Sequence, residues 1–571
     1  MPAAEAVLPA RAGAIDARPR AGERLVFISL LVLLAAFILV PLIRVLFVAF
    51  AGDQGPTLVH LANFFRRPLF REALANSLVA GGAGVVLASL IGVPLALLTV
   101  RCAFPGLALI RTLAVLPLVV PPFVGAVAFQ QVLGRSGMVN LLLMPWIGDP
   151  IPFMEGLTGV VLVQALHYFP LIYLNTAASL ANVDPALEEA ARNLGCHGLT
   201  LFRRITLPLV MPGFLAGALL VFIRVVDDLG TPLMLNYTKL LAPQAYLRIT
   251  TVGLNDVDGY VICVVLVALS LAALALARGY LGRAEYATGE RGAAAAARPL
   301  AGWRRWGGLA LCLLLVGISL IPHVGIVLLS FARIWSFSIL PSRYTLGNFE
   351  EILFRAPHFV VNTIKYAFLA SLADVVLGAA IAWLLVRGRV WGRNVLDAIA
   401  TLPLAIPGVV LAVGYLRTFH GWEVPGLGGP LTASWFILVI AYTMRRLPYT
   451  VRACTAAMQQ IPVSFEEAAM NLGAPPARTF RCVTIPLMIG GLVAGGLIAF
   501  ITSAVELSST IMLVPRIELG PLAYGIYIYM QSAVGRGPGA ALGVVAIALV
   551  AIGTWITNRV AGRGTGSPFR L

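Results

Sequence analysis

Glu189-Ala190-Ala191 begins a stretch that occurs twice in this chain. Gly195 follows after three residues, and Ile205-Thr206-Leu207-Pro208 follows after nine more. The second copy runs from Glu467-Ala468-Ala469 to Val483-Thr484-Ile485-Pro486, at a constant offset of 278 residues. Aligned without a gap, 184–217 and 462–495 are identical at 15 of 34 positions. Each copy is charged and lies between long apolar runs, and this setting indicates a docking surface for another protein.

The composition around the two copies is that of a membrane protein. Apolar residues make up 59% of the 571, charged residues only 12%, and the mean hydropathy is +0.91. Stretches of about 20 apolar residues are long enough to cross a bilayer as helices. We therefore predict an all-α membrane protein with about 12 transmembrane helices, near 26–50, 75–100, 107–133, 158–181, 209–236, 260–280, 306–332, 361–386, 396–418, 432–457, 487–514 and 540–560.

The repeat extends outward from the polar copies into the apolar spans. Asn76-Ser77 is matched by Asn362-Thr363 at an offset of 286, and Pro117 and Pro121 recur as Pro403 and Pro407. Six spans repeated in the same direction predict two parallel halves, related by a pseudo-two-fold axis along the membrane normal. The expected organisation is a disordered tail (1–24), a first half (25–282), a linker (283–303) and a second half (304–571).

The basic residues predict the orientation of the chain. We place Arg44 and Arg224 within spans, and most of the other Lys and Arg fall on one side if both termini face the cytoplasm. This asymmetry follows the positive-inside rule for the cytoplasmic (inner) membrane. Both polar repeats are then cytoplasmic. Because contact with the membrane surface accounts for the net charge of +16, no nucleic-acid partner is needed.

The repeated segment resembles the cytoplasmic loop signature of permease subunits in binding-protein-dependent ABC importers. The first copy matches every fixed position, whereas the second has Val483 and Ile485 in place of Ile and Leu. Most such permeases are separate chains that pair; this one resembles both halves fused, as in iron(III)-type permeases. The resemblance implies a duplicated type I importer fold, two copies of a cytoplasmic ATPase and a separate periplasmic or lipid-anchored solute-binding protein.

Local signals suit a coupling loop, although an ordinary amphipathic loop is the alternative. Asp184 predicts a helix N-cap, Ser464 with Glu467 predicts a capping box, and each glycine predicts a left-handed end to the helix. A second short helix is expected before the proline that begins the next span. The residues that we assign to coupling are Glu188, Glu189, Ala190, Gly195, Phe202, Arg203 and Pro208, and in the second copy Glu466, Glu467, Ala468, Gly473, Phe480, Arg481 and Pro486.

Other functional classes fit the sequence less well. The chain has no phosphate-binding loop, so the resemblance places ATP and Mg²⁺ on the partner ATPase and no cofactor here. A secondary transporter of the major facilitator type could also have twelve spans, but it does not call for the two matched loops. A membrane-embedded enzyme is a third possibility, although the six histidines are scattered and no catalytic residue or metal site stands out.

Four charged residues in the spans are candidates for the substrate path. Asp228 and Glu506 are equivalent at the 278 offset, each 20 residues after the proline that opens its span, and Arg224 and Asp227 lie close by. Two carboxylates near the external end would favour a cation, and with the fused architecture they favour ferric iron. Thiamine, a polyamine or a phosphonate remain alternatives. In a purely structural interpretation, Arg224 neutralises one Asp and Glu506 caps a broken helix near Ser508-Ser509.

Overall fold

The computed structural model describes residues 21–52, 54–283, 298–424, 429–531 and 535–561, and almost all of its regular structure is helical. In the first half the span positions are occupied by Ala21–Phe50 (α1 and α2), Pro68–Arg101 (α4), Leu107–Val119 with Pro122–Ile147 (α5 to α7), Gly156–Ala181 (α8), Gly198–Asp227 (α10 and α11) and Val257–Arg283 (α14). In the second half they are occupied by Trp303–Phe331 (α15), His358–Val386 (α17), Arg393–Leu404 with Gly408–Phe419 (α18 and α19), Phe436–Gln459 (α20), Pro476–Ala504 (α22 and α23) and Arg536–Ala561 (α26).

Shorter elements connect these spans. The short helices are α3 (Val59–Arg66), α9 (Pro185–Asn193), α12 (Gly230–Met234), α13 (Leu241–Leu247), α16 (Gly347–Glu350), α21 (Val463–Asn471), α24 (Thr510–Leu513) and α25 (Leu522–Met530). Three two-residue ladders pair β1 (Ala51–Gly52) with β2 (Gly55–Pro56), β3 (Cys102–Ala103) with β4 (Arg298–Pro299), and β5 (Glu423–Val424) with β6 (Gly429–Pro430).

The predicted membrane fold is confirmed, with a correction at the third span of each half. Among the described residues, nine helices are long and apolar enough to cross a membrane, and two bent pairs raise the number to eleven. The bends are 102° in the first half and 109° in the second, next to Pro121 and Pro407. Since proline lacks an N–H and restricts the residue before it, each expected straight span is broken there.

Helix α20 lies where the tenth span was expected. It is 24 residues long, but it carries Arg445, Arg446 and Arg452. The expectation that only Arg44 and Arg224 lie within spans was wrong. Arg445 and Arg446 are both buried, so these charges lie inside the protein.

The two halves exchange their first spans. Helix α2 (Val40–Phe50) packs against α19, where the Tyr415 hydroxyl donates to the Phe37 carbonyl at 2.8 Å. Helix α15 of the second half packs in the same way against α6 (Pro122–Leu133) of the first. Each half is therefore completed by a helix from the other.

Matching hydrogen bonds support the repeat. Asn76 donates to the Lys239 carbonyl at 3.1 Å, and Asn362 donates to the Gly520 carbonyl at 3.1 Å. The next residue in each half accepts a backbone N–H: Ser77 from Leu241 at 3.0 Å and Thr363 from Leu522 at 2.6 Å. The second span of each half thereby fixes the segment that leads into α13 or α25.

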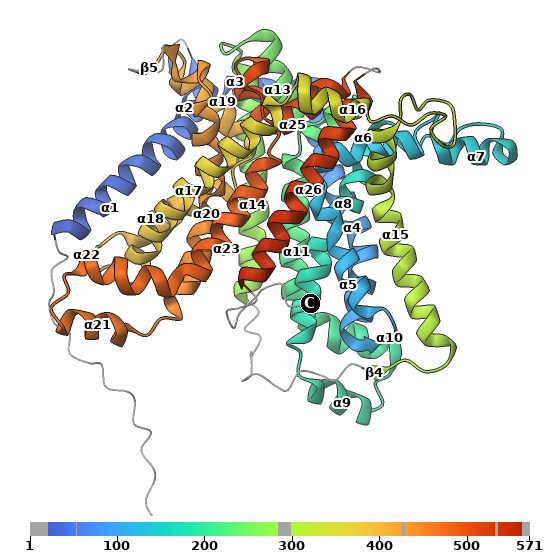
Figure 1. The fold of residues 1–571 in the computed structure, drawn as a ribbon, viewed down its shortest axis with the longest axis horizontal. Coiled ribbons are helices and arrows are strands. Elements are labelled where there is room, and N and C mark those ends of the chain that lie inside the picture. The colour runs from blue at the N-terminus through green and yellow to red at the C-terminus, as the bar shows by residue number, and fades with distance from the viewer. Residues whose placement is uncertain (1–20, 53, 284–297, 425–428, 532–534, 562–571) are drawn as a thin grey trace, which may run out of the picture.

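The helices α9, α10, α21 and α22 gather at one end of the molecule, which we call the loop face (Figure 1). Helices α3, α13, α16 and α25 lie at the opposite face. The expected tail mostly falls outside the described residues, and the first helix begins at Ala21, four residues before the expected boundary. Most of the expected linker (284–297) also lies outside them; its end forms β4, which pairs in parallel with β3 after α4.

Candidate functional site

The first element of each repeated segment is a nine-residue helix, α9 or α21. The Asp184 side chain accepts the Ala186 N–H at 2.9 Å, so the predicted N-cap is confirmed. The capping box predicted at Ser464 is wrong. Helix α21 begins at Val463 after Pro462, two residues before the start that a Ser464 cap requires, and its N-cap makes no side-chain hydrogen bond.

Both helices end at the predicted left-handed glycine. Gly195 has φ +86° and Gly473 has φ +87°, values that a residue with a side chain rarely adopts. The leucine before each glycine is almost fully in the open, with Leu194 86% exposed and Leu472 90% exposed. Glu189 and Ala190, and their equivalents Glu467 and Ala468, are also exposed. The tip of each loop therefore presents an apolar residue beside a carboxylate and an alanine, as a docking surface requires.

The first glutamate of each pair is buried and fixes the loop to the membrane helices. In the first half Arg101, at the end of α4, donates to Glu188 at 2.8 Å, and the Thr206 hydroxyl donates to the same carboxylate at 3.1 Å. Arg192 adds an ion pair at 3.6 Å within α9. A movement of this loop is thus tied directly to the second and fifth spans.

The second half repeats this arrangement. Arg387, just after α17, donates to Glu466 at 3.1 Å, and Thr484 donates to the same carboxylate at 3.0 Å. Arg387 also donates to the Ile461 carbonyl at 2.6 Å. The two arginines are 286 residues apart, an offset already seen elsewhere in the repeat. Neither arginine was predicted as a site residue, although the shared offset was a signal that could have identified both.

The second part of each segment differs from expectation. Instead of a separate short helix, α10 (Gly198–Leu201) continues through a π-turn (Phe202–Thr206) into α11 (Leu207–Asp227). Pro208 is therefore in the first turn of α11, within a continuous helix. The wider turn lets the Leu207 N–H bond to the Phe202 carbonyl just before the proline, which has no N–H to give.

The second half follows the same course, with α22 (Pro476–Thr479), a π-turn (Phe480–Thr484) and α23 (Ile485–Ala504). Pro486 again lies in the first turn of the long helix. Phe480 packs edge-on against Trp383 of its own half, with ring centroids 6.1 Å apart. Arg203 and Arg481 are exposed on the loop face.

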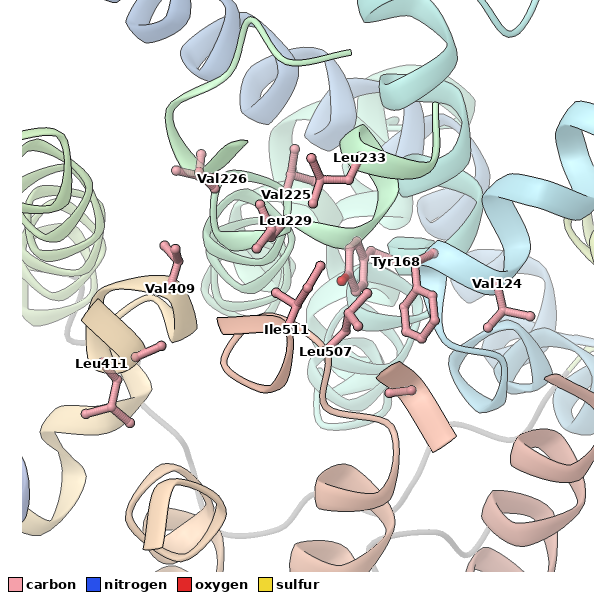
Figure 2. Close-up of a cluster of buried hydrophobic side chains, with 14 of the residues drawn as sticks. Val124, Tyr168, Val225, Val226, Leu229, Leu233, Val409, Leu411, Leu507 and Ile511 are labelled. Atoms are coloured by element: carbon pink, nitrogen blue, oxygen red, sulfur yellow. The ribbon is translucent and has the colours of Figure 1, made fainter. Parts of the chain in front are cut away.

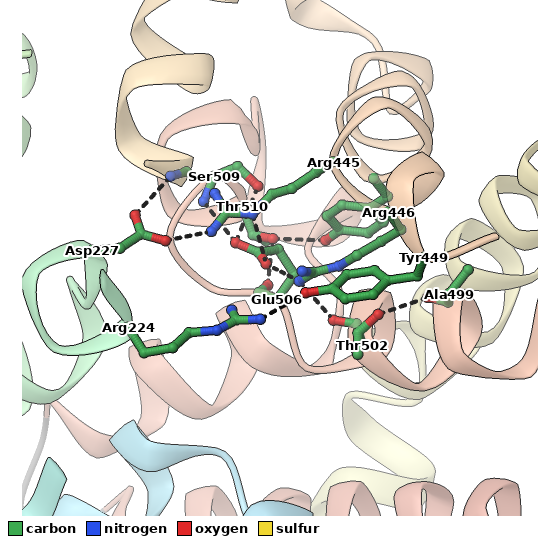
Figure 3. A network of polar contacts seen from close by, with 12 residues as sticks. Arg224, Asp227, Arg445, Arg446, Tyr449, Ala499, Thr502, Glu506, Ser509 and Thr510 are labelled. Atoms are coloured by element: carbon green, nitrogen blue, oxygen red, sulfur yellow. Dashed lines mark hydrogen bonds and ion pairs between the residues drawn. The ribbon is translucent and has the colours of Figure 1, made fainter. Parts of the chain in front are cut away.

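A buried ion-pair network joins the halves at the level of the predicted path residues (Figure 3). Arg445 donates to Asp227 at 2.7 Å, and the other oxygen of Asp227 accepts the Gly408 N–H at 2.8 Å. Glu506 pairs with Arg445 at 3.4 Å and is hydrogen-bonded to Arg446. Both carboxylates are thus neutralised by arginines of α20 rather than open to a cargo.

Arg224 does not make the contact expected of it. It was expected to neutralise one of the neighbouring aspartates, but it donates a hydrogen bond to the Tyr449 hydroxyl of the other half, at 2.8 Å (Figure 3). Asp227 takes its ion pair from Arg445 instead. The partner of Arg224 is therefore a neutral hydroxyl group and not a carboxylate.

The pseudo-equivalent carboxylates each cap a short helix. Asp228 accepts the Gly230 N–H at 3.0 Å at the start of α12 and takes a hydrogen bond from Gln164 at 2.9 Å. Glu506 accepts the Ser509 N–H at 3.3 Å just before α24. The cap expected of Glu506 in the structural interpretation is confirmed, and Asp228 is engaged in the same way.

The chain is similar in sequence to known transport proteins. The profile of the family described as "Binding-protein-dependent transport system inner membrane component" matches residues 18–283 and again 374–563. The chain belongs to this family. It is a permease of the ABC import class with two fused halves, a finding that decides against a secondary transporter and a membrane enzyme.

Three relatives show the range of the permease's similarities. It is 24% identical over 492 residues to the ferric transport system permease protein FbpB of Actinobacillus pleuropneumoniae, covering 85% of this chain and 71% of the relative. The putative ferric transport system permease protein FbpB 1 of Haemophilus influenzae is 26% identical over 502 residues, with 86% and 78% covered. The molybdenum transport system permease protein ModB of Escherichia coli is 33% identical over 208 residues, with 36% and 90% covered.

The permease has a cavity of about 600 Å³ between its halves. It is lined by parts of α11, α14, α18 and α20, and it includes Arg452, which pairs with Asp397 at 3.0 Å. Helix α20 continues from Arg452 to Gln459 and leads to the loop helix α21. The cavity therefore extends from the ion-pair network toward the loop face.

Apolar side chains pack beyond the network (Figure 2). Leu229 precedes α12, Leu507 and Ile511 belong to the α24 segment, and all three are buried. A methyl group on Gly230 would lie 2.9 Å from Leu507, so α12 and α24 approach closely across the half interface. The permease thus combines an apolar contact between short helices with a cavity of mixed charged and apolar lining on the loop-face side.

Proposed function

We propose that this permease is the transmembrane component of an ATP-driven importer for ferric iron. One copy of a cytoplasmic ATPase docks on each loop, and a separate solute-binding protein delivers the cargo at the opposite face. The loop face and both termini are cytoplasmic in this proposal, and ATP hydrolysis occurs on the partner subunits.

The observation that carries the proposal is the pair of matched loops. Each presents an exposed leucine and an exposed glutamate at its tip, while the neighbouring glutamate is bonded to the second and fifth spans. Force applied at the tip would reach the membrane helices through a charge-assisted contact, which is stronger than a neutral hydrogen bond. Iron is supported by the names of the two ferric transport relatives, each of which matches more than four fifths of the chain.

The proposal is tested by reconstituting the permease in liposomes with the ATPase and binding protein of its own transport system. We expect uptake of radioactive ferric iron that requires ATP inside the vesicles and the binding protein on the other side. Glu188→Ala combined with Glu466→Ala should abolish uptake while the chain remains in the membrane. Uptake that continues without ATP and follows an ion gradient would contradict the proposal.

Uptake of other substrates tests the identity of the cargo separately from the transport mechanism. Thiamine, putrescine or a phosphonate that is itself imported, with no iron uptake, would leave the importer in place and overturn iron as its cargo. The orientation has a separate readout in the exposed Cys482 on the loop face. A membrane-impermeant maleimide should label it in inside-out vesicles and not in intact cells.

A further inference from the structure

The charge in the cavity between the halves is positive rather than negative. Its lining contains four arginines and two aspartates: Arg224, Arg445, Arg446, Arg452, Asp227 and Asp397. Glu506, next to the cavity, supplies one further negative charge to the network. Counted over the lining residues and Glu506 alone, three acidic groups stand against four guanidinium groups, which leaves one positive charge.

The excess charge is carried by Arg224. Asp397 forms an ion pair with Arg452. Asp227 and Glu506 form ion pairs with Arg445 and Arg446 of α20. Arg224 has a neutral partner, the Tyr449 hydroxyl. A guanidinium has five N–H donors, and a phenol that accepts one hydrogen bond still has its own proton to donate.

Further donors beside the cavity lack partners. Within the described part of the chain, Arg445 Nη1 and Arg446 Nε are buried and make no hydrogen bond. These side chains are only 7% and 5% exposed. Both nitrogen atoms are closed off from the cavity, so they add positive charge beside it without contacting its contents.

We propose that this cavity is an anion site, in which Arg224 and the Tyr449 hydroxyl bind an oxyanion. This deepens the proposed function, on which it rests, because the anion is either free or a ligand that accompanies ferric iron. A bare cation is disfavoured, since the carboxylates of the network are already paired and the unpaired charge is positive. A volume of about 600 Å³ accommodates a tetrahedral oxyanion with water, or a small iron chelate.

The first test measures thermal unfolding of the purified full chain in detergent. The probes are sodium phosphate, sodium molybdate, ferric nitrilotriacetate and magnesium chloride, at constant ionic strength. We expect stabilisation by the oxyanions or by the ferric chelate, and no stabilisation by magnesium. Stabilisation by phosphate or molybdate alone identifies a free oxyanion as the ligand. Stabilisation only by the chelate identifies an anion that travels with iron.

Substitutions then locate the site. Arg224→Gln should raise the half-maximal anion concentration about ten-fold or more, because one charge-assisted contact is lost. Tyr449→Phe keeps the packing and should raise it several-fold, whereas Arg224→Lys should bind more tightly than Arg224→Gln. The matched control is Arg417→Gln, an exposed arginine with a neutral partner, Asn255, outside the cavity lining. It should leave the anion concentration unchanged.

Two results would overturn the anion site. One is stabilisation of the wild-type protein by magnesium and by none of the anionic probes. The other is an unchanged anion response in Arg224→Gln and Tyr449→Phe. If either occurs while ATP-dependent iron uptake persists in liposomes, the anion site fails and the importer stands. Loss of uptake in every condition, with anion binding intact, would instead contradict the proposed function.

Discussion

The two halves place a carboxylate at the same repeat position and surround it differently. Asp228 in the first half accepts from Gln164, a neutral amide, whereas Glu506 in the second half pairs with Arg445 and Arg446. At the 278 offset these arginines correspond to His167 and Tyr168. Duplication has kept the helix caps and concentrated the charge in one half. The halves are therefore alike in backbone and different in the charge that surrounds this position.

The largest expected effect on stability is at Glu506, the charged member of this pair of positions. Glu506→Gln leaves buried Arg446 without its ion pair, which should lower the free energy of unfolding by about 3–5 kcal/mol. Asp228→Asn should cost about 1 kcal/mol, because the amide oxygen can still accept the Gly230 N–H. Unfolding by sodium dodecyl sulfate in mixed micelles measures both variants. Equal losses would show that the two positions are energetically alike.

The next prediction compares the buried with the exposed glutamates of the loops. Glu188→Gln and Glu466→Gln should each weaken the attachment of a loop by about 1–3 kcal/mol, since a charge-assisted contact becomes neutral. ATP hydrolysis stimulated by the binding protein should fall in both variants. Glu189→Gln and Glu467→Gln leave that attachment intact and should alter affinity for the ATPase instead. A fall in coupling with only the exposed pair would contradict the attachment role.

A third prediction concerns the matched glycine turns. Gly195→Val and Gly473→Val should each cost about 1–2 kcal/mol locally, because a branched side chain is disfavoured at positive φ. Among the described residues, no atom beyond the two adjacent residues lies within 4 Å of the position that a Cβ would take at either glycine, so the cost is conformational. Asn tolerates this region, so Gly→Asn serves as the control and should retain most of the ATPase binding. Unequal losses in the two valine variants would reveal a functional asymmetry that the backbone does not show.

The smallest expected difference lies at the helix caps. Asp184→Ala removes an observed cap and should destabilise α9 by about 0.5–2 kcal/mol. Ser464→Ala, the equivalent test in α21, should have no measurable effect, since that hydroxyl caps nothing. Amide hydrogen exchange over 186–193 and 464–471 reports both changes. Faster exchange in the Ser464 variant would show that the hydroxyl does cap the helix, as the sequence predicted.

Much of the fold was predictable because the sequence contains two copies of the same half, and each copy can be checked against the other. A residue that recurs at a fixed offset, such as Asn76 with Asn362, is held at its position by contacts that both halves need. Left-handed glycines were predictable for a similar reason, since few other residues tolerate that backbone. The same logic applied to Arg101 and Arg387 would have located the partners of the buried glutamates.

Other features could not be obtained in this way. Arg445 and Arg446 lie in an apolar stretch. The partner of Arg445 is Asp227, 218 residues away, and the partner of Arg446 is Glu506, 60 residues away. Hydropathy averages over a window and does not show which charges will meet. The choice between Glu188 and Glu189 depends on the phase of a helix against its neighbours, which is a property of the packing. The exchanged first spans likewise left no periodic signal.

The exchanged first spans have a consequence for the order in which the protein is made. Phe37 leaves the ribosome and enters the membrane long before Tyr415, the residue that closes on it 378 positions later. During that interval α1 and α2 have lipid, or the insertion machinery, where α19 will later pack. Contacts between residues so distant in sequence form late and slowly. The earliest helix to be synthesised is thus among the last to reach its final neighbours, so truncation of the second half would leave it exposed to quality-control proteases.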